Sequence, residues 1–383
     1  MAPGAARAEV SASGFELVYT LPVETTLEQP DLRQAKDVWK EMIAGAKKRV
    51  DLCEFYITPG ETLDPVLAEL EAAAKRGVKI RFLAEKIFAK NSAEGFEKLK
   101  AIPNLELRVI DFNAVKKDGI VHAKYFIVDD REAYVGSQNF DWRSLKHIHE
   151  MGLRISKGRI IRDMAATFET DWANQARVAA GKKPKVSRTV RPSAQHTKRA
   201  YLVASPWAYN PPGVGDSEAE LVRLIDSAQK EVLVQVLDYA PLTRAKRFYP
   251  PVDNALRSAA ARGVTVRLMV SNWNAEHPAI DHLKSLSLVP GVEIKMVTLP
   301  LAAEGYIPFA RVIHSKYMVL DNGALWLGTS NWTGGYLDNS RNLEVVVKDE
   351  ALAGKAAAIH RQLWDSAYAE KLDVAKEYPK PKK

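Results

Sequence analysis

The sequence predicts an α/β protein built from two homologous halves, each an α/β sandwich in which helices flank a mixed β-sheet. Three observations predict this class. The chain has 383 residues, 46% of them hydrophobic, which suits a globular protein of about two domains that each bury a core. The same order of strand-like and helix-like segments occurs twice, and a motif of constant spacing closes each series. We therefore predict a first half at 1–185 and a second half at 186–383.

Periodic apolar residues define the elements of the first half. Val38, Met42 and Ala46 lie at helical spacing, so a helix is predicted there. Gly77 is placed to end a second helix, because glycine readily adopts the left-handed conformation found at helix C-termini. In chain order we expect a helix at 33–48, a strand at 49–57, a helix at 64–76, a strand at 78–84, a helix at 92–101, and strands at 105–110 and 121–128.

The second half repeats this order with small differences in loop length. The segments KRGVKIRFL and ARGVTVRLM occupy matching places in the two halves. Ser217 and Glu220 have the spacing of a capping box at the start of a helix. We expect a helix at 217–230, a strand at 231–237, a helix at 252–262, a strand at 264–270, a helix at 279–287, a strand at 292–298, and a last strand through the second motif.

The closing motif of each half reads H-x-K-x4-D-x6-G-[ST]-x-N. His314 follows His122 by 192 residues, and the spacing is complete in both copies. Alternate residues of a strand share a face, so each histidine should lie beside the lysine two positions further on. Turn residues after each strand predict hairpins, and therefore mixed sheets. The copies consist of His122, Lys124, Asp129, Gly136, Ser137 and Asn139, and of His314, Lys316, Asp321, Gly328, Thr329 and Asn331.

These residue types suit a phosphate group. Lysine supplies positive charge, and the asparagine amides and hydroxyl groups supply hydrogen bonds to phosphate oxygens. A double displacement at phosphorus requires two imidazoles, one as the nucleophile and one as the acid. A metal site is disfavoured, because the lysines repel cations and no H-E-x-x-H pattern is present. No cofactor is expected.

An acidic residue precedes an apolar strand after each motif. Glu150 follows His122 by 28 residues, and Glu344 follows His314 by 30. A carboxylate bonded to the far ring nitrogen would fix the histidine tautomer and stabilise the imidazolium. A surface acid at the start of a strand is the alternative interpretation.

The chain is basic, with a formal net charge of +8, which suits an anionic partner. The window 177–199 contains eight basic residues and no acid. It is interpreted either as a solvated linker between the halves or as an electrostatic guide for phosphate-bearing substrates.

Cysteine and apolar content bear on the compartment. Cys53 is the single cysteine, so no internal disulfide can form. No apolar stretch approaches the roughly 20 residues that span a bilayer. The N-terminal segment has the small residues found near signal cleavage sites but no apolar core. A periplasmic or secreted location is favoured, and a cytoplasmic one is the alternative.

The duplicated motif resembles the signature of the phospholipase D superfamily. The chain further resembles the branch of the lysosomal type-three and type-four phospholipase D proteins over roughly residues 17–372, through segments such as HAKYFIVDDREAYVGSQNFDWRSL, RFYPPVDNALRSAAARGVTVRLMVSNW and GTSNWTGGYL. That branch has a membrane anchor and luminal disulfides. This chain has neither, which suggests a soluble relative of bacterial type.

The resemblance implies a fold and a set of roles. The two halves would be related by a pseudo-twofold axis, with one active site between them and a phosphohistidine intermediate formed without metal. His122 would be the nucleophile and His314 the acid. The remaining expected site residues are the phosphate-binding Lys124, Lys316, Asn139, Asn331, Ser137 and Thr329, the orienting Glu150 and Glu344, and the signature acids Asp129 and Asp321.

The expected activity is hydrolysis of phosphodiester bonds. Phospholipid head groups are the favoured substrate, with peripheral membrane contact, and 5′ exonuclease action on single-stranded DNA or RNA is the alternative. A non-catalytic binding protein on the same scaffold is disfavoured, because both motifs are complete. Aromatic residues that could meet lipid or bases, or simply fill the core, are Trp142, Trp332, Tyr336, Phe248 and Tyr249.

Overall fold

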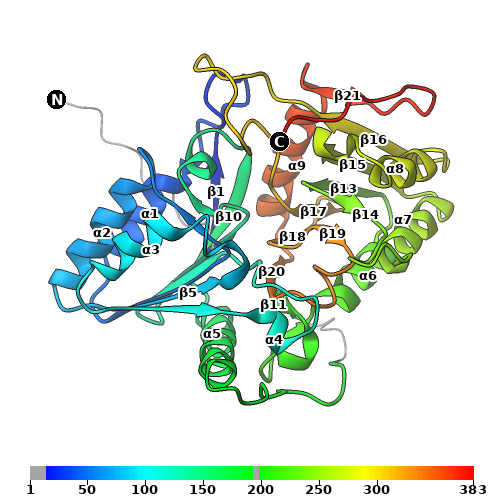
Figure 1. Ribbon diagram of the computed structural model, residues 1–383. Helices are drawn as coiled ribbons and strands as arrows, with labels where there is room; N and C mark the ends of the chain where they lie inside the picture. The colour runs from blue at the N-terminus through cyan, green and yellow to red at the C-terminus, as the bar shows by residue number, and fades with distance from the viewer. Residues whose placement is uncertain (1–13, 193–197) are drawn as a thin grey trace.

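A computed structural model describes residues 14–192 and 198–383. It contains two mixed β-sheets that stand side by side, each with helices on its outer face (Figure 1). The halves have the same order of elements, which confirms the predicted class.

The first half forms the left part of Figure 1. Its helices and strands are β1 (Phe15–Thr20), β2 (Arg33–Gln34), α1 (Ala35–Ala44), β3 (Arg49–Glu54), β4 (Ile57–Thr58), α2 (Asp64–Lys75), β5 (Lys79–Glu85), α3 (Ala93–Lys100), β6 (Leu105–Ile110), α4 (Phe112–Val115), β7 (Tyr125–Val128), β8 (Glu132–Gly136), β9 (Phe140–Asp141), β10 (Glu150–Ile155) and α5 (Gly158–Ala179).

The second half forms the right part of the view. It contains β11 (Ala200–Ser205), β12 (Gly215–Asp216), α6 (Ser217–Ser227), β13 (Glu231–Val236), β14 (Tyr239–Ala240), α7 (Pro251–Ala261), β15 (Thr265–Ser271), α8 (Ala279–Ser287), β16 (Val292–Val297), β17 (Tyr317–Leu320), β18 (Ala324–Gly328), β19 (Trp332–Thr333), β20 (Asn342–Val347), α9 (Glu350–Trp364) and β21 (Ala369–Lys371). The boundary at 185/186 stays a prediction.

The two large sheets repeat one topology. The first runs β2-β1-β10-β8-β7-β3-β5-β6, and the second runs β12-β11-β20-β18-β17-β13-β15-β16-β21. Matching neighbours also have matching sense: β3–β5–β6 and β13–β15–β16 are parallel, and the hairpins β7–β8 and β17–β18 are antiparallel. The first sheet therefore provides a template for assigning residue counterparts in the second.

A continuous apolar core joins the halves. Helices α5 and α9 contribute Phe168 and Ile359 to one cluster of buried side chains that includes residues of both large sheets. Separate clusters lie beneath α1 and α2 in the first half and beneath α6 and α7 in the second. The α5 and α9 helices were not anticipated from the sequence, although each has the apolar periodicity of a buried helix.

The predicted hairpins are confirmed. The turn between β7 and β8 places Asp129 and Asp130 at φ of 54° each, and the other turn places Asp321 and Asn322 at 51° and 56°. Aspartate and asparagine tolerate this left-handed conformation better than most residues.

Two local expectations are wrong. The strand predicted at 121–128 begins only at Tyr125, as β7, and the preceding segment pairs instead with the other half through a bridge from Val121 to Arg341. Helix α6 has no capping box either. Its N-cap is Asp216, whose side chain accepts a hydrogen bond from the backbone N–H of Glu218.

Candidate active site

His122 and His314 line one cavity of about 480 Å³ between the two halves. Both imidazoles are largely buried, at 4% and 7% exposed. Other residues that line this cavity are Phe55, Tyr56, Phe88, Asn139, Arg143, Asp238, Trp273, Phe309, Asn331 and Tyr336. The chain thus brings the two motifs to one site, although they lie 192 residues apart in the sequence.

Each histidine is fixed by the backbone of the opposite half. The backbone N–H of His122 donates to the carbonyl of Arg341 at 2.9 Å, and that of His314 donates to the carbonyl of His149 at 2.9 Å. Arg341 is itself fully buried and forms an ion pair with Asp171 of α5 at 2.8 Å. The site is therefore part of the interface between the halves.

Glu150 accepts hydrogen bonds from the ring of His314. Its carboxylate oxygens lie 2.9 and 3.0 Å from Nδ1. This bond keeps a proton on Nδ1, so Nε2 is the ring nitrogen that gains or loses a proton. Burial lowers the pKa of His314 to about 4, and the Glu150 carboxylate opposes that decrease.

Asn342 has the same relation to His122. Its Oδ1 lies 3.0 Å from Nδ1 of His122. The amide orientation is defined, because Nδ2 donates to the carbonyl of Tyr336 at 2.9 Å and Oδ1 accepts from the Thr329 hydroxyl at 2.8 Å. His122 therefore carries its proton on Nδ1. Burial first, and then Lys124 and Lys316, hold the pKa of His122 well below its usual value.

The two motif lysines are buried beside the histidines. Lys124 Nζ donates to the carbonyl of His122 and Lys316 Nζ to that of His314, both at 2.5 Å. Burial lowers the pKa of Lys316 to about 7, and burial together with repulsion from Lys316 holds the pKa of Lys124 well below its usual value. An anion bound between them would remove this penalty, because it compensates both charges.

The asparagines of the motifs also reach the cavity. Oδ1 of Asn139 and Oδ1 of Asn331 are buried and have no hydrogen-bond partner among the residues that the structure describes. The Asn331 amide nitrogen lies 3.3 Å from Asp238. Both side chains are thus positioned to contact a ligand.

Asp129 and Asp321 do not lie in the cavity. Asp129 accepts hydrogen bonds from the backbone N–H groups of Lys47, Lys48 and Arg49 at 2.7–2.8 Å. Asp321 binds three successive N–H groups, from Gln229 to Glu231, in the same way. The structure gives these signature acids a structural role, because each ties a hairpin turn to the start of the neighbouring strand.

The motif hydroxyls also differ from expectation. Ser137 and Thr329 are fully buried and do not line the cavity. Ser137 exchanges hydrogen bonds with the backbone of Met151, next to Glu150. Thr329 bonds to Asn342. They support the partners of the histidines and do not contact the cavity.

Glu344 does not orient His314. It is buried and accepts from the hydroxyl groups of Ser330, at 2.5 Å, and Ser217. In the repeated topology Glu344 lies opposite Gly328, as Gly152 lies opposite Gly136, so Gly152 is its counterpart. The counterpart of Glu150 is Asn342, which follows His314 by 28 residues, just as Glu150 follows His122. This shared offset of 28 residues is the sequence signal by which Asn342 could have been identified.

Other lining residues were not anticipated from the sequence. Phe55, Tyr56 and Phe88 pack on one another with centroid distances of 4.6–5.6 Å and form an aromatic wall from the first half. Tyr336, which was anticipated, lies 4.7 Å from the His122 ring. Trp142 does not line the cavity, and Trp332 is buried against Trp326 in the core.

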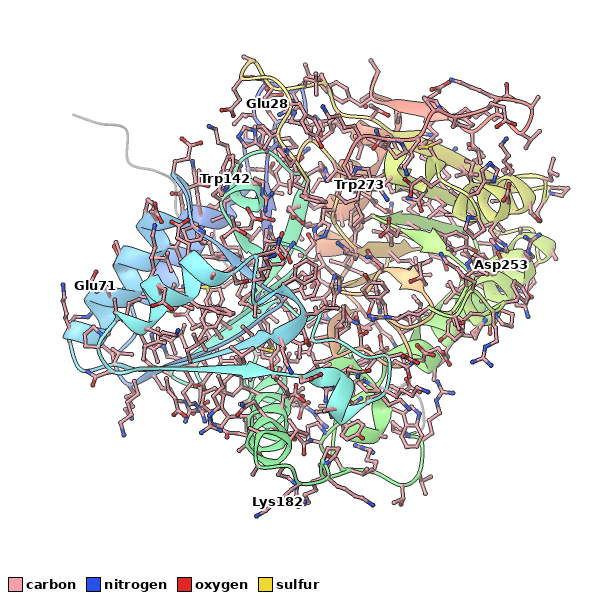
Figure 2. All side chains as sticks on the ribbon, viewed as in Figure 1. Glu28, Glu71, Trp142, Lys182, Asp253 and Trp273 are labelled. Carbon is pink, nitrogen blue, oxygen red and sulfur yellow. The ribbon has the colours of Figure 1, made fainter. Side chains whose placement is uncertain are left out.

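The basic linker lies away from this cavity. Lys182 lies at the lower edge of the view, whereas the cavity residue Trp273 lies above its middle (Figure 2). Arg191 pairs with Asp216 and Glu218, and Arg188 donates to backbone carbonyls near Pro211. These contacts attach the linker to the second half, so they do not support its interpretation as a guide for substrate.

Sequence and fold comparisons define the class of protein. The family model described as "Cardiolipin synthase, PLD-like domain" matches the chain twice, over residues 39–172 and 221–364. The chain therefore belongs to the phospholipase D superfamily, and it is a phosphodiesterase of that superfamily. None of the helices that the structure describes has the length and apolar character needed to cross a membrane.

Individual relatives carry two kinds of name. The chain is 31% identical to "5'-3' exonuclease PLD3" of Xenopus laevis, over 86% of this chain and 75% of that protein. It is also 31% identical to "Phospholipase D Z" of Dictyostelium discoideum, over 87% and 85%. Phosphatidylserine synthase of Haemophilus influenzae shares the fold, with a TM-score of 0.63 at 13% identity over 88% and 85% of the two chains.

Proposed function

We propose that this protein hydrolyses single-stranded nucleic acid from its 5′ end through a phosphohistidine intermediate. The observation that carries the chemistry is the pair of oppositely supported imidazoles beside two buried lysines. The observation that favours nucleic acid is the aromatic wall of Phe55, Tyr56 and Phe88, because bases stack on aromatic rings at about 1–3 kcal/mol each. The relatives named exonuclease support the same choice.

The neutral His122 attacks first. Its Nε2 lone pair forms a bond to phosphorus while the bond from phosphorus to the leaving oxygen breaks. The imidazolium of His314 gives its Nε2 proton to that oxygen, and Glu150 stabilises the charged ring. The lysines and asparagines bind the phosphoryl oxygens, where charge develops.

The second step restores the enzyme. His314, now neutral, removes a proton from water, and the resulting hydroxide attacks phosphorus. The nitrogen–phosphorus bond breaks, and the product leaves with a terminal phosphate. His122 is the better leaving ring because its partner, Asn342, is neutral and stabilises a cationic phosphohistidine less than a carboxylate would.

The test compares two substrates with the same enzyme. We expect stepwise release of nucleotides from a 5′-hydroxyl single-stranded DNA, no release of choline from phosphatidylcholine vesicles, and no activity in His122→Ala. Choline release without nucleotide release would refute the proposal.

Phospholipid hydrolysis, the preference from the sequence, is the second candidate. Phe309 lines the cavity and is 54% exposed, and Ile87, next to the cavity residue Phe88, is 62% exposed. Exposed apolar side chains near a cavity suit contact with a lipid surface. The relative named phospholipase D Z supports this candidate. The vesicle assay above distinguishes it.

A further inference from the structure

A basic hairpin projects beside the cavity in the second half only. Residues 241–250 connect β14 to α7. Leu242 pairs with Phe248 in antiparallel sense, and Thr243 donates a backbone hydrogen bond to Arg247 at 2.8 Å. The turn is therefore an ordered element that holds its side chains in fixed places.

Two adjacent glycines allow this hairpin to pack closely on the active site. A Cβ atom on Gly334 would lie 2.9 Å from Cγ of Tyr249, and one on Gly335 would lie 2.9 Å from Cγ of Arg244. Gly335 also has φ of +95°, which favours glycine. The next residue is Tyr336, which lines the cavity.

A short path of contacts leads from the hairpin to the reacting phosphate site. The Arg244 guanidinium lies 5.9 Å from the centroid of the Tyr336 ring, and that ring lies 4.7 Å from the ring of His122. Positive charge on the hairpin therefore begins one side chain away from the proposed nucleophile.

The hairpin has no internal charge compensation. Arg244, Lys246 and Arg247 are exposed, and the stretch YAPLTRAKRFYP at 239–250 contains no acid. None of the three cations forms an ion pair with any residue in 14–192 or 198–383. The equivalent connection of the first half, between β4 and α2, is shorter and carries Glu61 and no cation.

We propose that the basic hairpin binds the backbone phosphates of nucleotides that continue from the scissile phosphodiester into the second half. This inference rests on the proposed nuclease function. A substrate with one phosphate fills only the site between the two lysines, so cations beyond it serve a substrate with further phosphates. Because the first half lacks a matching element, the strand extends toward the second half, while the aromatic wall of the first half takes the terminal base.

The experiment uses the full chain with Lys246→Ala/Arg247→Ala. Its matched control is Lys182→Ala/Lys183→Ala, which removes the same charge from the linker, where Lys182 lies at the lower edge of the molecule in Figure 2. Two substrates are compared: a twelve-nucleotide 5′-hydroxyl single-stranded DNA and the p-nitrophenyl ester of thymidine 3′-phosphate, which has one phosphodiester.

We expect the hairpin variant to raise KM for the twelve-nucleotide DNA about 3- to 10-fold and to leave kcat/KM for the ester within about 2-fold. The slope of log KM against log salt should fall by about 1.4, because each lost phosphate contact on a single strand contributes about 0.7. The linker variant should match the unmodified protein in both measurements.

Three outcomes would overturn the inference. The hairpin variant could have the same KM for DNA as the linker variant, or its kcat/KM could fall by the same factor on DNA and on the ester. It could also lose binding to vesicles of phosphatidylglycerol while its kinetics on DNA stay unchanged, which would make the hairpin a membrane contact. A different result would refute the proposed nuclease function itself. If the unmodified protein cleaves the ester but cleaves no single-stranded DNA of any length, that function fails and the inference fails with it.

Discussion

The two copies of the motif share a backbone and differ in what supports the histidine. Glu150 and Asn342 each begin a strand, β10 or β20, in matching register with their neighbours. One bonds to Nδ1 of His314 with a carboxylate, and the other bonds to Nδ1 of His122 with an amide oxygen. The fold is symmetric, but the electrostatic environments of the two rings are not.

This difference suits the two opposite roles that we propose for the histidines. A carboxylate favours the imidazolium, which suits an acid, whereas a neutral amide fixes the tautomer without adding charge, which suits a nucleophile. Burial lowers the pKa of both rings, and only that of His314 is opposed by a carboxylate in contact with the ring. The predictions below test it, beginning with the largest expected effect.

Removing either imidazole should abolish cleavage of DNA but affect an activated ester differently. We expect His122→Ala and His314→Ala to lose roughly 10⁴-fold or more on DNA. The leaving group of the p-nitrophenyl ester needs no proton, so in His314→Ala the His122 imidazole should still attack phosphorus. The second step should then stop, because no base activates the water. Intact-protein mass spectrometry should find the nucleotidyl adduct in His314→Ala and none in His122→Ala. An adduct in His122→Ala instead would reverse the two roles.

The two acids should differ sharply in importance. Glu150→Gln should lower kcat about 10²- to 10³-fold, because the imidazolium of His314 loses its counter-charge. Glu344→Gln is the matched control. It should stay within a few-fold, since Glu344 bonds to serine hydroxyls and does not reach a histidine. Equal losses in the two variants would contradict the assignment of Asn342, and not Glu344, as the counterpart of Glu150.

Giving His122 a carboxylate partner, as His314 has, should change the pH dependence of kcat/KM. Asn342→Asp places a carboxylate on His122 and raises its pKa, so a larger fraction of the nucleophile is protonated and unable to attack. In the plot of log kcat/KM against pH, the acid limb should move to higher pH by about one unit. At pH values on that limb, kcat/KM should therefore fall about 10-fold. An unchanged limb, with the fold retained by circular dichroism, would indicate that His122 is not the group that must be neutral.

Lys316 should make stability depend on pH in the unliganded protein. Its pKa in the folded protein is about 7, against about 10.5 in the unfolded chain, so between these values the unfolded chain binds more protons. Stability from this group therefore rises with pH from about 7 to 10, by up to about 1.4 kcal/mol per unit, and is lowest below pH 7. Urea titrations at pH 7 and 9 should show that the free energy of unfolding rises less between these pH values in Lys316→Met than in the unmodified protein. Saturating phosphate should reduce the increase in the unmodified protein.

Much of the fold followed from the sequence because the apolar periods and turn residues are local signals. The hairpin turns at Asp129 and Asp321 and the strands β3, β5 and β6 are examples. The N-terminal strand β1 was missed because it pairs with β10, more than 130 residues away, and no local pattern reveals that pairing.

The site was only partly predictable for the same reason. The motif residues that we propose to bind phosphate, such as Lys124 and Asn139, lie at fixed spacing from the histidines and were identified. Their supporting contacts depend on pairing between the halves. A carboxylate was expected beside each histidine, so Glu344 was selected, whereas the residue that contacts His122 is the uncharged Asn342. The aromatic wall could not be assigned, because Phe55 and Phe88 come together only through the fold.

The exchange of partners across the interface has an evolutionary consequence. Glu150 of the first half serves His314 of the second, and Asn342 of the second serves His122 of the first. In an assembly of two identical subunits every substitution would occur at both positions, so both rings would have the same partner. Fusion of the copies into one chain allows a single base change to alter one partner alone. The covalent link between the halves is thus what permits the two histidines to have different partners.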